Sequence, residues 1–357
     1  MTALQPTEVI WYAVAFLLAA GIVAFVTPLT IHVATVFRIH DAPDGRLKKH
    51  ERPTPYLGGL AVATGFVIAF SLLSTSDSIG QRALGILAGG FMMLLLGLYD
   101  DLIDLVPLVK FLGQMLAAAA LYKAGVRIEL AMLGPWSNLV LTVLWITGIT
   151  NAFNIIDVMD GLASGVACIA ALFLFVIASA VGDAPDVPFM AIVLAGSLVG
   201  FLRFNFTPAR IFLGDTGSLF IGFMMGALSM LVSYSHHNPL AATAPLVLLA
   251  VPIFDTGFVA LHRARQGIPF FRGSPDHFAL RVAHSGTGVR RTVLHTWRVA
   301  GGLGLISLLI VFGPPRLVPW VLGACGLGAL VAFVLLSRLP APDARARAGL
   351  SEVAEEA

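Results

Sequence analysis

Long apolar stretches alternate with short polar segments along most of this chain. A helix needs roughly 20 apolar residues to cross the hydrocarbon core of a bilayer, with about 17 to 25 the usual range. Eleven stretches approach this length, near residues 10–37, 58–73, 83–98, 106–121, 139–150, 161–181, 187–202, 219–233, 240–261, 299–312 and 317–336. The pattern predicts an all-α, polytopic transmembrane helical bundle of about 11 spans.

Composition supports a membrane protein and excludes most soluble classes. Hydrophobic residues make up 58% of the 357 residues and charged residues only 12%, and the mean hydropathy is +0.90. A typical soluble domain is roughly 25% charged. Disordered chains, coiled coils and nucleic-acid-binding modules need far more charge than this chain has, so we expect no nucleic acid partner. The two cysteines stand far apart, which excludes a disulfide framework and a cysteine zinc site.

The distribution of lysine and arginine predicts the orientation. If the N-terminus is outside and the spans alternate, the inside segments hold 18 of these residues and the outside segments 4. Positive residues are enriched on the cytoplasmic side of membrane proteins. We therefore expect the N-terminus outside, the C-terminus in the cytoplasm, a single transmembrane catalytic domain over 1–338 and a flexible cytoplasmic tail over 339–357. The inside loops are long and rich in motifs, which places the chemistry at the cytoplasmic face.

Acidic residues recur at helix ends that this topology brings to the cytoplasmic surface. Ionisable groups near the hydrocarbon are costly, which makes them candidates for function. Each also has a structural alternative, such as a solvated helix end, helix capping or a polar contact between helices. The residues are Asp100, Asp101, Asp157, Asp160, Asp215 and Asp255.

Carboxylates that converge at one surface repel each other unless a cation joins them. A ligand set of oxygens favours Mg²⁺, with Mn²⁺ as the alternative, over zinc. Mg²⁺ is usually held by one or two carboxylates together with substrate phosphates, an arrangement that points to phosphoryl transfer. The helix start at Asp215 suits a metal-bridged phosphate, and the basic loop at 46–52 supplies further cations. In the last inside loop, His277 stands beside Asp276 and among several arginines.

Taken together, these motifs resemble the polyprenyl-phosphate N-acetylhexosamine-1-phosphate transferase family, of the glycosyltransferase family 4 type. They occur in family order from Asp41 to about Gly288. The count of eleven spans is similar to the GlcNAc-1-phosphate branch rather than to the ten-span phospho-MurNAc-pentapeptide translocase branch. The motifs are Asp41-Ala-Pro43, Lys48, His50, Pro53, Gly58-Gly59, Asp100-Asp101, Asn151-x-x-Asn154-x-x-Asp157-x-x-Asp160-Gly-Leu162, Phe212-x-Gly-Asp-x-Gly-Ser218, Pro252-x-x-Asp255-Thr256 and Asp276-His277.

The resemblance implies an Mg²⁺-dependent enzyme (EC 2.7.8.-) of the cytoplasmic membrane. It would transfer a sugar-1-phosphate, with GlcNAc-1-phosphate expected, from a UDP-sugar to a polyprenyl phosphate such as undecaprenyl phosphate. UMP would be released, and the lipid product would start cell-envelope glycan synthesis. Two alternatives remain: another donor, such as UDP-MurNAc-pentapeptide or a different UDP-HexNAc, and, from another class, an ion-coupled transporter. The oligomeric state is open between monomer and homodimer.

The resemblance also assigns roles to individual residues, and the sequence departs from the family pattern twice. Val158 stands where the family usually has glycine, and Phe278 begins an apolar run where the family has further histidines. The missing histidines argue against a muropeptide donor. The assigned residues are Asp100, Asp101 and His277 for catalysis, Asp215 and Asp101 for the metal, and Lys48, Asn151, Asn154, Asp157, Asp160, Asn205 and Phe212 for the nucleotide-sugar.

Overall fold

The computed structural model describes residues 5–41, 54–74, 80–130, 134–236, 238–267 and 276–340. These residues are almost entirely helical, as expected, because an α-helix satisfies its own backbone hydrogen bonds and therefore tolerates lipid. A short antiparallel pair, β1 (His40–Asp41) and β2 (Thr54–Pro55), precedes the second helix. The helices are α1 (Pro6–Val36), α2 (Gly58–Leu73), α3 (Gln81–Ile103), α4 (Pro107–Lys123), α5 (Pro135–Ile156), α6 (Leu162–Val181), α7 (Asp186–Asn205), α8 (Gly214–Met230), α9 (Ala244–Leu248), α10 (Ala250–Arg265), α11 (Phe278–Val282), α12 (Val289–Phe312) and α13 (Val318–Ser337).

Within the described residues, 7 helices are long and apolar enough to cross a membrane. An eighth span is formed if α10 is counted together with the segment Pro239–Leu248 before it, from which it is bent by 70°. Helices α2, α4 and α8 have 16, 17 and 17 residues. At 1.5 Å per residue they are roughly 24–26 Å long, less than the ~30 Å hydrocarbon core. The helical bundle is confirmed, whereas the count of eleven spans and the orientation stay predictions.

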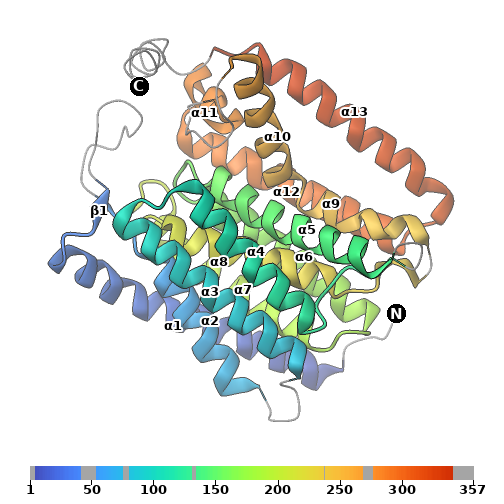
Figure 1. Ribbon diagram of the computed structural model, residues 1–357, viewed down its shortest axis with the longest axis horizontal. Helices are drawn as coiled ribbons and strands as arrows, with labels where there is room; N and C mark the ends of the chain where they lie inside the picture. The colour runs from blue at the N-terminus through green and yellow to red at the C-terminus, as the bar shows by residue number, and fades with distance from the viewer. Residues whose placement is uncertain are drawn as a thin grey trace.

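Helix α8 lies at the centre of the bundle. It is buried continuously from Thr216 to Ser229 and packs against α2, α3 and α5. In Figure 1, α1 and α13 lie at opposite edges of the molecule, with α6, α7 and α8 between them. The only residue buried within α13 is Val318, so its apolar side chains are left for lipid. Residues 341–357 of the expected tail lie outside the described residues, and the boundary between domain and tail stays a prediction.

Small residues allow the helices of the bundle to pack closely. A side chain at Gly196 or Gly200 of α7 would overlap the backbone carbonyls of Phe16 and Ala20 in α1. Glycines four apart lie on one helix face, and such pairs commonly mediate close contact between membrane helices. The close packing of α7 against α1 therefore depends on the absence of a side chain at Gly196 and Gly200.

Candidate active site

The ends of four helices meet at one group of polar side chains, which we call the acid cluster: Asp100 (α3), Lys110 (α4), Asn154 (α5) and Asp215 (α8). The Lys110 Nζ atom lies 2.5 Å from Asp100 Oδ2 and 2.5 Å from Asp215 Oδ2. Asn154 Nδ2 donates to Asp215 Oδ1 at 2.8 Å and to Ser218 Oγ at 2.9 Å. The structure thus brings together Asp100, Asn154 and Asp215, which the sequence singled out on three separate helices.

Asp101 holds the first turn of α8 in place. Its Oδ1 accepts a hydrogen bond from the backbone N–H of Asp215 at 2.8 Å. Its Oδ2 accepts from the backbone N–H of Thr216 at 3.0 Å and from the Thr216 hydroxyl at 2.6 Å. The first N–H groups of a helix have no partner within the helix, and a carboxylate there also complements the helix dipole. Asp101 therefore orients the backbone that carries Asp215; its expected catalytic and metal roles stay predictions.

Glycines bring the start of α8 against α2 and α3. A Cβ at Gly97 would overlap the backbone carbonyl of Asp215, and one at Gly59 would overlap Gly217. Gly214 has φ +72°, in the left-handed region that side chains disfavour. The missing side chains explain how a carboxylate on α3 can reach the backbone of α8.

This packing leads to a prediction about stability. We expect Gly97→Ala to destabilise the protein by about 1–3 kcal/mol, the usual cost of overpacking, because the new methyl group must push α8 away from α3. Gly148→Ala in α5 is the matched control, because a Cβ there would meet no atom within 4 Å. Thermal unfolding in detergent measures both variants, and equal melting temperatures would contradict the close approach.

The loop between α5 and α6 carries two further predicted residues, Asp157 and Asp160. Asp160 Oδ2 accepts a hydrogen bond from the Ala209 backbone N–H at 2.9 Å, which ties this loop to the one before α8. Burial raises the pKa of Asp157 well above its usual range, and the negative charges of Asp215 and Asp101 raise it further. A carboxyl held near other carboxylates in this way ionises more readily when a cation is added.

Asn205 is buried, and both ends of its side-chain amide bond to the protein. Its Oδ1 accepts from the Gly161 N–H at 3.1 Å and from the Ser164 hydroxyl at 2.9 Å. Its Nδ2 donates to the Ile211 carbonyl at 3.0 Å. The side chain thus ties together the two loops that flank the acid cluster, and contact with a nucleotide stays a prediction.

The other predicted nucleotide residues lie in different surroundings. Asn151, one turn before Asn154, donates to the Thr147 carbonyl at 2.8 Å and to the Gln114 side chain at 2.5 Å. The half-buried Phe212 is held through its backbone, where its N–H donates to the Pro55 carbonyl of β2 at 2.8 Å. Lys48 lies outside the described residues.

His277 belongs to a second buried group, at the start of α11. Its Nδ1 lies 2.8 Å from Asp255 Oδ2. Asp276 Oδ1 accepts a hydrogen bond from Arg281 at 2.8 Å. Among the described residues, no hydrogen bond or ion pair joins His277 to the acid cluster. Asp255 lies on α10, which packs against α5, the helix that carries Asn154.

The sequence indicates no role for Lys110 or Ser218. For Asp255 it leaves open whether the residue makes a structural contact or acts directly. Lys110 could have been found from its setting. It is one of only two lysines in α4, it stands at the helix start that follows Asp100, and a cation there needs a negative partner. Ser218 gives no such signal, since its bond to Asn154 depends on the packing of α8 against α5.

The acid cluster offers two carboxylates, the type of ligand that Mg²⁺ prefers. In the described residues, no group of three or more His, Cys, Asp or Glu side chains could hold a metal by itself. The carboxylates of Asp100 and Asp215 nevertheless face one position, which the Lys110 ammonium neutralises. Because Mg²⁺ is usually bound by one or two protein carboxylates plus substrate phosphates, this pair fits an ion that is completed by a diphosphate.

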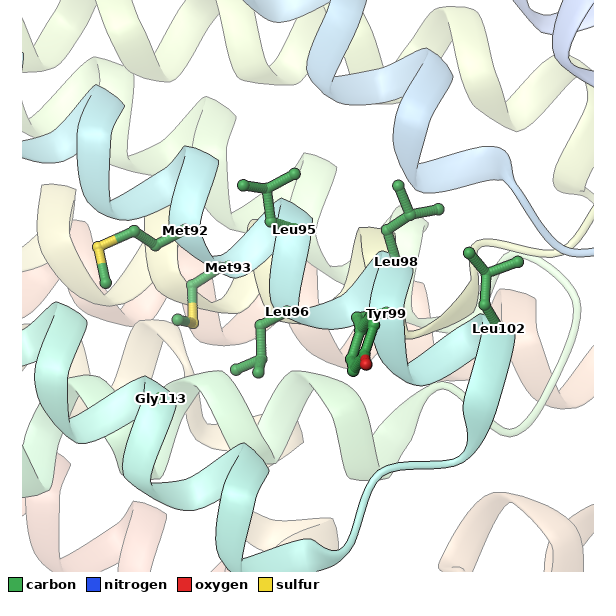
Figure 2. A pocket seen from close by; sticks show the side chains of 8 residues that line it. All are labelled: Met92, Met93, Leu95, Leu96, Leu98, Tyr99, Leu102 and Gly113. Carbon is green, nitrogen blue, oxygen red and sulfur yellow. The ribbon is translucent and has the colours of Figure 1, made fainter.

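A groove of about 530 Å³ runs along α3 and reaches α4 (Figure 2). Asp100 and Lys110 belong to these two helices but do not line the groove. A wall without carboxylates or cations can accommodate hydrocarbon but offers no charge to a phosphate, so the acid cluster remains the candidate for chemistry. The lining residues are Met92, Met93, Leu95, Leu96, Leu98, Tyr99, Leu102 and Gly113.

The chain is similar to known proteins over most of its length. The sequence profile of glycosyl transferase family 4 matches residues 83–233. A probable undecaprenyl-phosphate N-acetylglucosaminyl 1-phosphate transferase of Bacillus subtilis is 35% identical, over 84% of this chain and 84% of its own. A decaprenyl-phosphate N-acetylglucosaminephosphotransferase of Mycolicibacterium smegmatis is 31% identical, over 82% and 79%. A phospho-N-acetylmuramoyl-pentapeptide-transferase of Listeria monocytogenes is 29% identical, over 84% and 95%.

Proposed function

Because the chain belongs to glycosyl transferase family 4 and is a polyprenyl-phosphate N-acetylhexosamine-1-phosphate transferase, we propose that its donor is UDP-GlcNAc and its acceptor undecaprenyl phosphate or a similar polyprenyl phosphate. It is a multi-pass membrane enzyme. The names of the Bacillus and Mycolicibacterium relatives support GlcNAc over a muropeptide. The residues that follow His277 support the same choice, because Phe278, Ala279 and Leu280 offer no polar group to a larger donor.

The observation that carries the proposal is the acid cluster. Two carboxylates from different helices flank one ammonium group, and an asparagine amide fixes the orientation of Asp215. Phosphoryl transfer depends mainly on positioning and on neutralising charge, which is what such a group provides. An excess of lysine and arginine in the same set of loops supports a cytoplasmic location, where UDP-sugars are available.

The proposed reaction is a single displacement at phosphorus. A phosphate oxygen of the acceptor attacks the β-phosphorus of UDP-GlcNAc and forms a new P–O bond. The bond from the β-phosphorus to the bridging oxygen breaks, and UMP leaves with that electron pair. A lipid phosphate is already ionised near neutral pH, so direct attack needs little help from a base. We therefore propose direct attack over a covalent phospho-aspartate.

The acid cluster would contact the phosphates of both substrates. The family uses Mg²⁺; when bound, Mg²⁺ supplies positive charge to the diphosphate oxygens. Asp215 and Asp100 would hold it, and Lys110 would move from these carboxylates to a phosphate oxygen. Asp101 would keep the α8 backbone in place for Asp215, whose N–H it accepts.

The loops around the acid cluster would bind the nucleotide-sugar. No group among the described residues donates a hydrogen bond to Asp157, and the negative charges of Asp215 and Asp101 act on its carboxyl group. This carboxyl group is therefore available to a sugar hydroxyl or to the metal. Phe212 would stack on uracil, and Lys48 would contact a phosphate. Asn205 would act indirectly, through the two loops that it ties together.

The donor can be identified with the purified protein. It is incubated with Mg²⁺, undecaprenyl phosphate and, in separate reactions, UDP-GlcNAc, UDP-GalNAc and UDP-MurNAc-pentapeptide, and the lipid products are identified by mass spectrometry. We expect an undecaprenyl diphosphate that carries a single N-acetylhexosamine from UDP-GlcNAc, and UMP in equal amount. A lipid product formed only from UDP-MurNAc-pentapeptide would refute the proposed donor.

The ion-coupled transporter, which the sequence alone left open, is not supported. The family assignment identifies an enzyme. Transporter sites lie near the bilayer midplane at discontinuous helices, whereas the acid cluster is formed by the last turn of α3 and the first turns of α4 and α8.

A further inference from the structure

We propose that the buried Asp255 is a positioning residue for His277: it holds the Nδ1 side of the imidazole so that Nε2 meets a phosphate oxygen of the donor. The inference rests on the proposed function and on the catalytic role that the family resemblance implies for His277. It adds Asp255 to the site as a residue that acts only through His277.

Both carboxylate oxygens of Asp255 are used at the same point of the chain. Oδ2 lies 2.8 Å from His277 Nδ1, and Oδ1 accepts a hydrogen bond from the Phe278 N–H at 3.1 Å. Asp255 is 0% exposed, so water does not compete for either bond. One side chain on α10 therefore fixes both the ring of His277 and the peptide that follows it.

A second ion pair holds the same segment from the other side. Asp276 is 1% exposed and Arg281 4% exposed, and they are joined at 2.8 Å. Arg281 also donates to the Leu339 carbonyl, just after α13, at 3.1 Å. The backbone around His277 is thus anchored to α10 and to the end of α13, which leaves the imidazole little freedom to turn.

The ring nitrogens of His277 are not equivalent. Nδ1 is occupied by Asp255, whereas Nε2 has no hydrogen-bond partner among the described residues. Nε2 is also not one of the fully buried polar atoms of these residues. Nε2 is therefore the atom that a ligand can reach. A histidine oriented through one nitrogen by a carboxylate commonly performs its function through the other, with the carboxylate stabilising the imidazolium.

The location agrees with this role. Helix α10 packs against α5, whose last turns carry Asn154 of the acid cluster. If the Asp255 carboxylate served only to stabilise a contact between helices, an apolar residue of similar size would usually stabilise that contact at least as well. When both ring nitrogens carry a proton, His277 would donate its Nε2–H to a phosphate oxygen as negative charge moves to UMP.

A double-mutant cycle tests the inference by the rate of UMP release from UDP-GlcNAc. We expect His277→Ala to lower kcat about a hundredfold and Asp255→Asn at least tenfold, with little change in the KM for the acceptor. The double variant should be no slower than His277→Ala alone, because Asp255 acts through His277. Asp183→Asn, which removes an exposed acid from a loop far along the chain, is the control and should keep wild-type kcat.

Losses that multiply in the double variant, or an unchanged kcat in Asp255→Asn, would overturn the positioning role. If Asp255→Asn fails to fold, ¹⁵N spectra of histidine-labelled wild-type protein decide instead, with His277→Gln used for assignment. A protonated Nδ1 at His277 is expected, and an unprotonated Nδ1 would refute the inference. Failure of the proposed function has a different signature, namely that wild-type protein forms no lipid product.

Discussion

Asp215→Asn is expected to lower kcat about a thousandfold, a loss of about 4 kcal/mol in transition-state stabilisation. The amide has the shape of the carboxylate and can still accept the hydrogen bond from Asn154. It lacks the negative charge that faces Lys110, and its NH₂ group cannot replace the oxygen that a divalent ion requires. We therefore expect a folded protein that binds Mg²⁺ and diphosphate poorly.

Steady-state UMP release at saturating UDP-GlcNAc and several Mg²⁺ concentrations measures this effect. Asp104→Asn is the matched control: Asp104 is an exposed acid at the end of the same α3 that carries Asp100, and its φ of +50° suits asparagine. The control should retain wild-type kcat. Turnover by Asp215→Asn within a few-fold of wild type would remove Asp215 from the site.

The convergence of the site could be predicted from sequence because it depends on topology. When consecutive spans alternate, the end of one helix and the start of the next lie on the same side, whatever the packing. Asp100 at the end of α3, Asn154 near the end of α5 and Asp215 at the start of α8 therefore had to face one side of the bundle. Their acidic and amide groups then indicated phosphate and metal chemistry.

The partners of each residue could not be predicted, because they depend on which helices touch. Nothing in the sequence shows that Asp101 caps α8 while its neighbour Asp100 faces Lys110. On a helix, adjacent residues point about 100° apart, so two consecutive acids reach different neighbours. The same limit applies to Asn205, whose type suggested a ligand but whose amide bonds Gly161 and Ile211.

Span lengths set a further limit on what hydropathy predicts. Helices α2, α4 and α8 are short, and α10 is bent sharply from the segment before it. Short helices are accommodated when neighbouring helices surround them, as α8 is surrounded, because lipid then need not cover their ends. An apolar run in the sequence shows that a helix avoids water, but it does not show whether lipid or protein surrounds that helix.

The second large effect is expected at Lys110. We expect Lys110→Met to lower kcat about a hundredfold, because methionine keeps the apolar stem but removes the charge between Asp100 and Asp215. Without that charge, the two carboxylates repel the approaching acceptor phosphate, and one fewer positive charge offsets this repulsion. Lys110→Arg should recover part of the activity, since it restores the charge on a different geometry. Lys123→Met, an exposed lysine at the other end of α4, is the control.

The same variant separates a catalytic lysine from a purely structural one. If Asp100 and Asp215 hold Mg²⁺ as proposed, the Lys110 ammonium competes with the ion for both carboxylates, and its removal should strengthen Mg²⁺ binding while turnover falls. Ligands that bind the folded state raise the melting temperature according to their affinity. We expect Mg²⁺ alone to raise the melting temperature of Lys110→Met more than that of wild type or Lys123→Met. A smaller rise in Lys110→Met would mean that the lysine organises the acid cluster rather than exchanging with the metal.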